Sequence, residues 1–532
     1  MKRFPFWMTR ALLGALLAGA GLIGPGPRHT AGVRADGLAS PPPHPSAEGG
    51  AMAGRSAGVT ALSGSSLRRA ARPAAASSAP GRSFDPGVTG GASGPAAARD
   101  DDPPRAPADA STRQRFWAWD FHDEAFYELW AREVHGSDRL RIYVEEGQAV
   151  PGPALLRLAT AFEDVIYPRL RDAYGSEPLP GIDGDTAVTI LLMDIRDGRH
   201  HGVPDATYYA GYFDPLNEAR QADLPRGRQS NEREMIYVDV AAPTNVGGDE
   251  LLQTVAHEFT HLIVWNHDPD ETDWLTEGIC QLAIHLAGLG HPRQHVLAFL
   301  NQPDDALTRW TGSARDYGKV HLFLLYLYDQ LAREDPGWLR RLVSEPANGM
   351  DGLARLLPPE RSPSQLFRDY ALALFVNTPA PGAGRYAFAS IDLGQPGGYP
   401  RARPNTHPAD RIDAAAFDLG PWSIRADAFV VKRTPVEISI TAAVPDAVCV
   451  GAAMSTNPTP ALAGIDRLEA TCLEAQPSPA WVVDAPARDR ATAVFTVVAN
   501  AADTPTGAEI TPASLAGPMV DRTAFLPIAI RR

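Results

Sequence analysis

Two histidines four residues apart, with a glutamate directly after the first, are the residues of this sequence best placed to do chemistry. His257, Glu258 and His261 form the pattern His-Glu-x-x-His. On an α-helix, side chains four residues apart lie on one face about 6 Å apart, so two imidazoles can bind one metal ion. Glu258 lies one step round the helix, where its carboxylate can take a proton from water instead of binding the metal. The pattern predicts one catalytic Zn²⁺ held by the two histidines, with Glu258 as the general base.

The sequence around the histidines predicts the helix that must position them. Asp249 and Glu250 follow Gly247-Gly248, as expected at a helix start, where carboxylates meet unsatisfied N–H groups. At about 100° per residue, the apolar side chains gather on the side of the helix opposite the histidines. These apolar residues are Leu251, Leu252, Val255, Phe259, Leu262 and Ile263. We therefore expect both imidazoles to face a cleft or solvent.

A catalytic zinc normally has three protein ligands and one open position, so a third ligand is required. His267 has the three-histidine spacing of the metzincins, but Val264 occupies the position where a glycine lets the chain turn back. Glu277 lies in a second predicted helix that Asp273 can cap. If this helix returns beside the first, it brings the carboxylate to the metal. We favour Glu277 as the third ligand, with Gln281, one turn later, as a hydrogen-bond partner of the metal ligands.

The two predicted helices together resemble the gluzincins, in which His-Glu-x-x-His is followed by Trp-Leu-x-Glu-Gly, here residues 274–278. The residues of the motif most resemble those of the hyicolysin-like and immune-inhibitor-A-like secreted bacterial peptidases. Ala210-Gly211-Tyr212-Phe213 and Tyr317-Gly318 add to this resemblance, which covers residues 154–376. The sequence departs from the thermolysin pattern, because Thr276 and Gln281 stand where asparagine and aspartate would be.

The resemblance implies a zincin-like catalytic domain that acts on a protein or peptide substrate. It also implies a residue downstream of the ligands that stabilises the oxyanion of the reaction. Tyr317 is the candidate for this role and His321 is the alternative. Gluzincins bind an extended peptide along a strand at the sheet edge. The segment Met235–Asp239 is either that strand or an interior strand of the sheet.

Composition and pattern divide the chain into four segments. Residues 1–35 begin with positive charges, continue with an apolar run and end near Ala35, which predicts a cleaved secretory signal peptide. Residues 36–112 are rich in proline, alanine, glycine and serine, which predicts a disordered linker or pro-segment. Residues 113–400 predict an α+β zinc metallopeptidase domain with a small mixed sheet, the active-site helix and a helical C-terminal subdomain. Residues 415–532 predict a small β-sandwich-like module.

Charge and cysteine content narrow the possible partners and the compartment. The formal net charge of −14 argues against nucleic acid as a partner. The apolar run at residues 11–23 is too short to anchor the chain stably in a membrane. Because an exported protein meets oxidising conditions, Cys449 and Cys472 can form a disulfide, whereas Cys280 is expected to be a buried thiol. No sequence feature indicates an oligomeric state.

An acidic loop lies between the two predicted helices and contains Asp268, Asp270, Glu271 and Asp273. Hard cations prefer clustered oxygen ligands, so Ca²⁺ is a possible second cofactor. The spacing matches no calcium-binding loop, and we therefore expect a solvated turn.

These features together predict a secreted zinc-dependent metalloendopeptidase that hydrolyses peptide bonds of extracellular proteins. One alternative is a non-catalytic surface or adhesin-like protein that binds through its C-terminal module. The others are a metzincin-like peptidase with His267 as third ligand and a peptidase that acts on cell-wall or glycan-linked peptides. The intact Glu258 favours catalysis, because a protein that only binds has no use for the base.

Overall fold

The structure is a computed structural model that describes residues 113–514, except 205, 242–244, 381, 408–414, 432–435, 456–464, 474–479 and 484–491. The predicted signal peptide and the predicted linker or pro-segment, residues 1–112, lie outside the described residues. The described part mixes helices and sheets, as an α+β protein does. Within it, no helix is long and apolar enough to cross a membrane.

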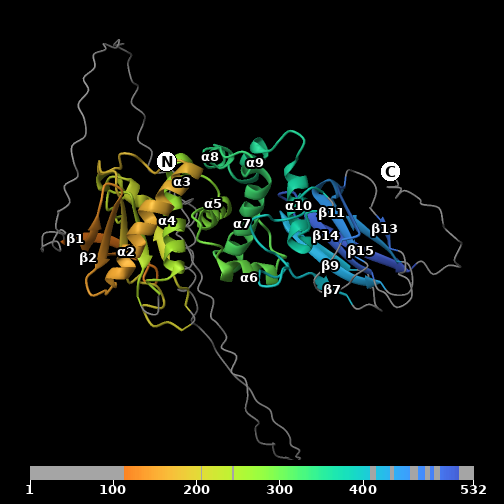
Figure 1. Ribbon diagram of the computed structural model, residues 1–532, viewed down its shortest axis with the longest axis horizontal. Helices are drawn as coiled ribbons and strands as arrows, with labels where there is room; N and C mark the ends of the chain where they lie inside the picture. Colours follow the sequence, from red (N-terminus) through yellow and green to blue (C-terminus); the bar gives the residue numbers. More distant parts are fainter. Residues whose placement is uncertain are drawn as a thin grey trace, which may run out of the picture. The chain divides into compact units, whose positions relative to one another are not determined.

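A six-stranded mixed sheet forms the first layer, with the strand order β1-β2-β3-β4-β6-β5 (Figure 1). Its strands are β1 (Arg113–Asp120), β2 (Ala125–Gly136), β3 (Leu140–Glu145), β4 (Val188–Met193), β5 (Gly211–Phe213) and β6 (Met235–Asp239). The strands β3, β4 and β6 are parallel, and β1, β2 and β5 pair antiparallel with their neighbours. The segment Met235–Asp239 is therefore an interior strand, and β5 is the edge strand on that side.

Successive side chains of a strand point to opposite faces of the sheet, and both faces of this sheet are apolar. In β4, Leu191 and Met193 join an aromatic-rich cluster with Phe116 of β1 and Tyr237 of β6. The intervening residues of β4 face the main core, where three helical segments cover the sheet. These segments are α2 (Gly152–Ala161), the π-helical turn η3 (Phe162–Ile166) and α3 (Tyr167–Tyr174).

The chain then becomes helical and forms the part that completes the candidate site. The helices are α4 (Asp249–His267), α5 (Asp273–Leu286), α6 (Arg293–Asn301), α7 (Ala314–Leu327) with the π-helical turn η6 (Tyr328–Ala332), α8 (Trp338–Val343), α9 (Gly349–Leu356) and α10 (Pro363–Val376). Short 3₁₀ turns are η4 (Pro215–Glu218) and η5 (Gln221–Asp223). Helix α4 packs against β5 and β6, α5 packs against α4, and α7 packs against α5. The candidate site therefore lies where an edge strand and three helices meet.

The C-terminal part consists of two sheets with an apolar cluster between them, and their strands pair antiparallel except for the parallel pair β7 and β9. Its elements are β7 (Asn405–Thr406), β8 (Ala415–Leu419), β9 (Ser423–Val431), β10 (Val436–Ala442), η7 (Pro445–Ala447), β11 (Val448–Ser455), β12 (Arg467–Cys472), β13 (Ala480–Val483), β14 (Thr492–Asn500) and β15 (Thr506–Ser514). The described residues from Ala415 to Ser514 are thus β-rich. The two sheets have the orders β13-β10-β15-β8 and β12-β11-β14-β9-β7.

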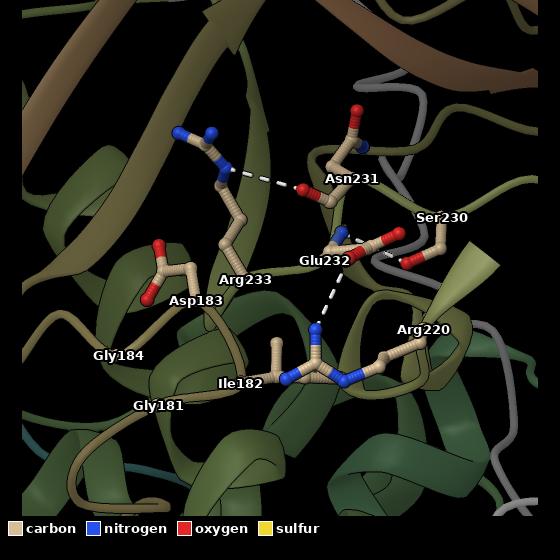
Figure 2. A pocket seen from close by; sticks show the side chains of 9 residues that line it. All are labelled: Gly181, Ile182, Asp183, Gly184, Arg220, Ser230, Asn231, Glu232 and Arg233. Atoms are coloured by element: carbon tan, nitrogen blue, oxygen red, sulfur yellow. Dashed lines mark hydrogen bonds and ion pairs between the residues drawn. The ribbon is translucent and has the colours of Figure 1, made fainter. Parts of the chain in front are cut away.

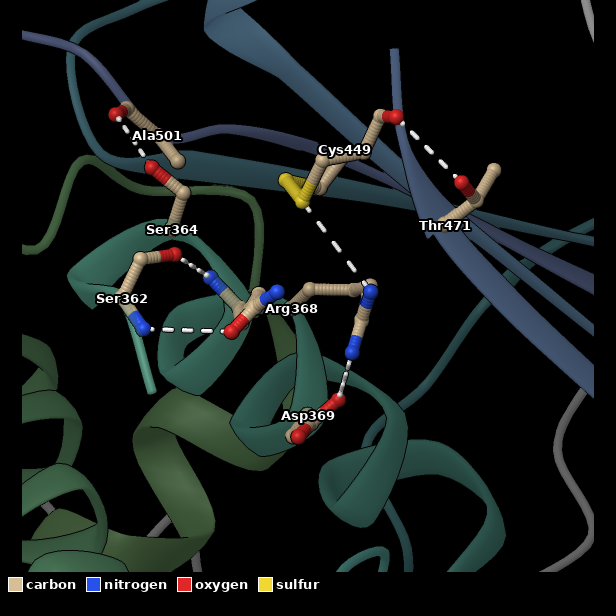
Figure 3. Close-up of a disulfide and its surroundings, with 9 residues drawn as sticks. Ser362, Ser364, Arg368, Asp369, Cys449, Thr471 and Ala501 are labelled. Carbon is tan, nitrogen blue, oxygen red and sulfur yellow. Dashed lines mark hydrogen bonds and ion pairs between the residues drawn. A yellow bond between two sulfur atoms is a disulfide. The ribbon is translucent and has the colours of Figure 1, made fainter. Parts of the chain in front are cut away.

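The predicted disulfide is confirmed, because Cys449 of β11 and Cys472 of β12 are bonded and lie directly opposite each other (Figure 3). Helix α10 packs on this sheet. A side chain at Gly451 would come within 2.7 Å of Leu372, so glycine is needed for the close approach. Beside it, Arg368 bonds to Asp369 at 2.7 Å and places its guanidinium 4.0 Å from the Cys472 sulfur.

Candidate metal centre

Helix α4 carries His257 and His261, and its sequence explains where the helix begins. Gly248 is the N-cap residue and Asp249 and Glu250 form the first turn, as predicted for carboxylates near unsatisfied N–H groups. The two imidazole rings lie 5.0 Å apart, centroid to centroid. They do not face open solvent, since His257 is 1% and His261 is 5% exposed. Of the two expected surroundings, a cleft or solvent, open solvent is wrong, because β5, α5 and α7 lie beside the histidines.

Helix α5 brings Glu277 to the two histidines. Its N-cap is Thr272, and Asp273 is the first helical residue instead of the cap that the sequence predicted. Glu277 Oε2 lies 3.2 Å from His257 Nε2 and 3.7 Å from His261 Nε2. The two histidine Nε2 atoms are themselves 3.2 Å apart. The three side chains therefore converge as expected, and they form a group that could hold a metal ion.

The separations between the two Nε2 atoms and Glu277 Oε2 can be compared with those between ligand atoms around a tetrahedral zinc ion. Bonds of about 2.05 Å at tetrahedral angles place neighbouring ligand atoms about 3.3 Å apart. The observed separations of 3.2, 3.2 and 3.7 Å match this edge length. Glu277 is 1% exposed, and neither of its carboxylate oxygens has an ordinary hydrogen-bond partner among the described residues. A buried carboxylate without such partners fits a metal ligand.

The charges of the group are consistent with a cation site. Burial opposes ionisation of Glu277, but the neighbouring histidines, His261 first, lower its pKa to about 2. Burial also lowers the pKa of His257, which favours the neutral imidazole. A metal ligand must be an unprotonated imidazole or an ionised carboxylate. Both side chains are thus in the protonation state that metal binding requires.

Gln281 touches the first ligand, as the sequence predicted. Its Nε2 lies 3.4 Å from His257 Nδ1, and its Oε1 has no partner among the described residues. Turning the amide by 180° brings Oε1 to Nδ1, where it accepts the Nδ1–H of the neutral ring. This tautomer leaves the Nε2 lone pair directed at Glu277 and the metal position. Gln281 is thus one group that can fix this tautomer, and a backbone hydrogen bond at Cys280 also acts on the His257 ring.

Glu258 is the most deeply buried carboxylate of the site, at 0% exposure. Burial raises its pKa well above the usual range, and the charge of Glu277 adds to the rise. The backbone amide of Phe213 opposes this rise without forming a hydrogen bond of ordinary geometry. The edge strand β5 passes very close, since a side chain at Gly211 would lie 3.1 Å from Glu258 Cγ and 2.9 Å from the Tyr237 carbonyl. Glycine at this position lets the strand run beside the carboxylate.

Tyr317 lies beside the metal group, and His321 does not. Tyr317 belongs to α7, and its ring is 6.0 Å from that of His257. It stacks on His295 at 5.1 Å. His321, one turn later, turns away. Its Nδ1 lies 3.2 Å from the Gln281 carbonyl, and its Nε2 lies 3.1 Å from His291. Of the two candidates for oxyanion stabilisation, Tyr317 is the one near the ligands.

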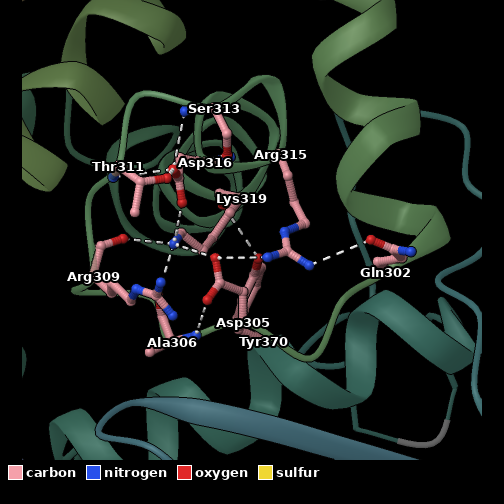
Figure 4. Close-up of polar contacts among 10 residues, drawn as sticks. All are labelled: Gln302, Asp305, Ala306, Arg309, Thr311, Ser313, Arg315, Asp316, Lys319 and Tyr370. Atoms are coloured by element: carbon pink, nitrogen blue, oxygen red, sulfur yellow. Dashed lines mark hydrogen bonds and ion pairs between the residues drawn. The ribbon is translucent and has the colours of Figure 1, made fainter. Parts of the chain in front are cut away.

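A buried lysine fixes the start of α7, where Tyr317 lies (Figure 4). The Lys319 ammonium is 1% exposed and bonds to Asp316 at 2.8 Å and Asp305 at 3.2 Å. It also donates to the carbonyls of Ala306 and Arg309, both at 2.7 Å. This network closes the loop before α7, which carries Trp310 against the Tyr317 ring at 4.9 Å. A buried ammonium with four partners stabilises this geometry instead of taking part in chemistry.

His267 lies outside the metal group. Helix α4 continues without a turn through Val264 to His267, as the lack of glycine there predicted. The His267 ring packs at Gly175, where an added side chain would come within 2.4 Å of its Nε2. The metzincin-like arrangement therefore does not form.

The acidic loop after α4 is not the solvated turn that we expected. Asp268 is 5% and Glu271 is 3% exposed. Burial, followed by the charge of Glu271, raises the pKa of Asp268 to about 7. Glu271 Oε1 accepts hydrogen bonds from the Thr272 hydroxyl and from the Gly349 amide, both at 2.8 Å, and so joins the loop to α9. In the described part of the chain this loop does not gather three ligand atoms, so Ca²⁺ remains unsupported here.

Two other features were not predicted from the sequence. Asp120, Asp123 and His201 form a second group that could hold a metal ion. No local signal indicates it, because Asp120 and His201 are separated by 81 positions. A cavity of about 670 Å³ is lined by Gly181, Ile182, Asp183, Gly184, Arg220, Ser230, Asn231, Glu232 and Arg233 (Figure 2). It contains none of the residues of the metal centre.

Comparison with known proteins does not identify a family for this chain. No protein-family profile matches the sequence, and no curated protein matches it. Among solved structures, the chain is similar to the pre-peptidase C-terminal domain of a collagenase from Bacillus anthracis. That likeness has a TM-score of 0.15 at 8% identity and covers 21% of this chain and 95% of the other. A likeness of this size does not establish fold or function.

Proposed function

We propose that this protein is a secreted zinc-dependent metalloendopeptidase of the gluzincin type, with a zincin-like catalytic domain, which hydrolyses peptide bonds of extracellular proteins. One observation carries the proposal. His257, His261 and Glu277 converge at the spacing of tetrahedral ligands, with the carboxylate of Glu258 on the adjacent helix position. Two nitrogens and one oxygen are the donor set of a catalytic zinc with one position left for water or substrate.

The zinc ion and the protein side chains would have different roles in the reaction. A zinc ion bound here would lower the pKa of its water and polarise the scissile carbonyl. Glu258 would accept the proton of the attacking water and deliver it to the leaving amine. Its raised pKa suits this role, because a carboxylate that binds protons more tightly is a stronger base. Tyr317 lies on the His257 side of the group and is the candidate donor to the developing oxyanion.

The edge strand β5 supplies a place for the substrate backbone. It pairs with β6 on one side and ends the sheet on the other. An extended peptide can pair with the outer side of such a strand through main-chain hydrogen bonds, which gives affinity with little sequence specificity. Because Gly211 lies against Glu258, a peptide on this strand would pass the general base. The predicted signal peptide places this activity outside the cell.

The test is cleavage of casein or gelatin by purified wild-type protein, with Glu258→Gln and zinc chelation as controls. We expect cleavage by the wild type, none after chelation with recovery on adding Zn²⁺, and none by Glu258→Gln at an unchanged zinc content. Activity that survives Glu258→Gln would refute the general base. Zinc binding with no cleavage of any protein substrate would instead favour the non-catalytic binding protein.

A further inference from the structure

We propose that Asp120, Asp123 and His201 bind a second divalent ion of the zinc class, at a site separate from the metal centre. One ligand atom from each of the three side chains lies within 4.8 Å of the others. The donors come from two segments of the chain: the turn between β1 and β2, and the loop between β4 and β5. Binding of this ion does not depend on the peptidase proposal.

The turn after β1 brings the two aspartates together. Asp120 Oδ1 accepts hydrogen bonds from the backbone amides of His122 at 3.0 Å and Asp123 at 2.9 Å. These bonds fold the chain back so that the Asp123 carboxylate returns toward Asp120. His201 approaches from the other segment, with its Nε2 3.1 Å from Asp120 Oδ2 and 3.3 Å from Oδ1. An imidazole nitrogen thus faces a carboxylate whose Oδ2 is not used by the backbone.

Asp120 is a buried charge that a cation would compensate. It is 4% exposed, and its Oδ1 accepts two backbone N–H groups. Within the described residues, no lysine or arginine lies within ion-pair distance of it, and His201 is its ion-pair partner. A buried carboxylate is costly unless a cation pairs with it.

The surroundings add further negative charge. The buried Tyr127 hydroxyl has no hydrogen-bond partner among the described residues. Burial raises the pKa of this hydroxyl, the nearby charges of Glu145, Asp120 and Asp194 raise it further, and the charge of Arg196 lowers it. The guanidinium of Arg196 lies 3.7 Å from the centre of the Tyr127 ring. The negative charges of Glu145, Asp120 and Asp194 therefore all act on the Tyr127 hydroxyl. Arg196 is the cation beside this ring.

The donor set indicates which ions fit. Imidazole binds zinc and its first-row neighbours, whereas Ca²⁺ and Mg²⁺ prefer sites made only of oxygen ligands. Asp123 and His201 are the more exposed members of the group, so the site is open to an ion from solvent. Water can complete the coordination of an ion held by three protein ligands.

The site would tie the turn to the loop that leads into the edge strand. The loop is already joined to the turn by Tyr209, whose ring stacks on Phe121 with centroids 3.9 Å apart. Two residues later the chain enters β5, where Gly211 lies against Glu258. An ion at His201 would therefore restrain the start of the strand that passes the general base.

Zinc stoichiometry tests the inference, measured by equilibrium dialysis against Zn²⁺ and elemental analysis of the folded full-length protein. We expect two equivalents in the wild type and one in His257→Ala/His261→Ala, which removes the metal centre. Adding His201→Ala to that double variant should remove the second equivalent. The matched control is His200→Ala, because His200 touches the His201 ring with centroids 5.0 Å apart and contacts Asp194 at 3.0 Å, but supplies no ligand atom to the group. It should keep the wild-type stoichiometry.

Asp123→Asn provides a second variant that leaves the backbone bonds of Asp120 intact, and in the His257→Ala/His261→Ala background it should weaken zinc binding at least 10-fold. The inference is overturned if His257→Ala/His261→Ala binds no zinc while its circular dichroism spectrum is that of the wild type. It is also overturned if the remaining equivalent survives both His201→Ala and Asp123→Asn. Zinc that is lost only with His201→Ala would support this site and count against the metal centre, so the two proposals fail separately.

Discussion

Replacing Gly278 by alanine is expected to lower zinc affinity although Gly278 does not touch the metal group. It follows Glu277 in α5, at the point where α5 meets α7. A side chain there would lie 2.6 Å from Leu324 Cδ2, 3.1 Å from Leu324 Cγ and 3.3 Å from Val320 Cβ. Carbon atoms in contact prefer about 3.5–4.0 Å, so α5 must move away from α7 by several tenths of an ångström. This movement shifts Glu277.

The size of the effect follows from these distances. In a free helix, glycine to alanine stabilises by about 1 kcal/mol. Overpacking a buried contact costs about 1–3 kcal/mol, and both neighbours are fully buried, so the net result is a loss of about 0–2 kcal/mol of stability. Metal sites tolerate displacements of about 0.2 Å in ligand distance. We expect zinc affinity to fall about 10- to 100-fold, as it does when the support of a ligand is lost.

The assay is competition for Zn²⁺ with a chromophoric chelator, together with thermal unfolding. Gly152→Ala is the matched control, because nothing lies within 4 Å of a side chain at that helix position, and it should leave zinc affinity unchanged without lowering the unfolding midpoint. Adding Leu324→Ala to Gly278→Ala makes room for the new methyl group, so it should recover zinc affinity without recovering stability. Wild-type zinc affinity and an unchanged unfolding midpoint in Gly278→Ala would refute the packing argument.

The other predictions concern single side chains. Glu258→Gln should keep zinc but lose at least about 10²-fold in kcat, since it removes the base; a proteolysis assay at equal zinc content checks this. Tyr317→Phe should lower kcat by about 10²- to 10³-fold with little change in KM if its hydroxyl stabilises the oxyanion, and a change in KM alone would contradict that role. Gln281→Leu should weaken zinc binding about 10- to 100-fold, because the tautomer of His257 is no longer fixed; equal chelator competition in variant and wild type would exclude this. Burial and the charge of His285 lower the pKa of His291 to about 4, below the unfolded value of about 6.5, so the folded state binds fewer protons in that window. Stability should therefore fall by at most about 3 kcal/mol as the pH falls from 6.5 to 4, and His291→Gln should reduce this slope in urea unfolding.

The local pattern of α4 and α5 was sufficient to predict which residues converge. His257 and His261 share a helix face because of their spacing, and this follows from helix geometry alone. Glu277 required one further assumption, that α5 returns beside α4, and the structure has this arrangement. The disulfide followed from the small number of cysteines, because Cys449 and Cys472 lie in neighbouring segments of the same β-rich region.

Other features depended on contacts between segments that no local pattern records. Whether Met235–Asp239 lies inside the sheet or at its edge is set by β5, a strand of only three residues. The burial of the histidine face and of Asp268 comes from elements far away in the sequence, since a polar residue looks the same in a sequence whether or not another element covers it. The histidine face is therefore buried, and the expected solvated turn failed for the same reason.

The sequence by itself determined the donor types, their spacing on each helix and the apolar faces, because backbone periodicity connects residues a few positions apart. Only the tertiary structure decided which donors share a site. It placed Asp120 beside His201, 81 positions away, and it turned His321 from the ligands toward His291. The physical reason is that a binding site is defined by distances of a few ångström in space, and packing of the whole core sets those distances between segments that are remote along the chain.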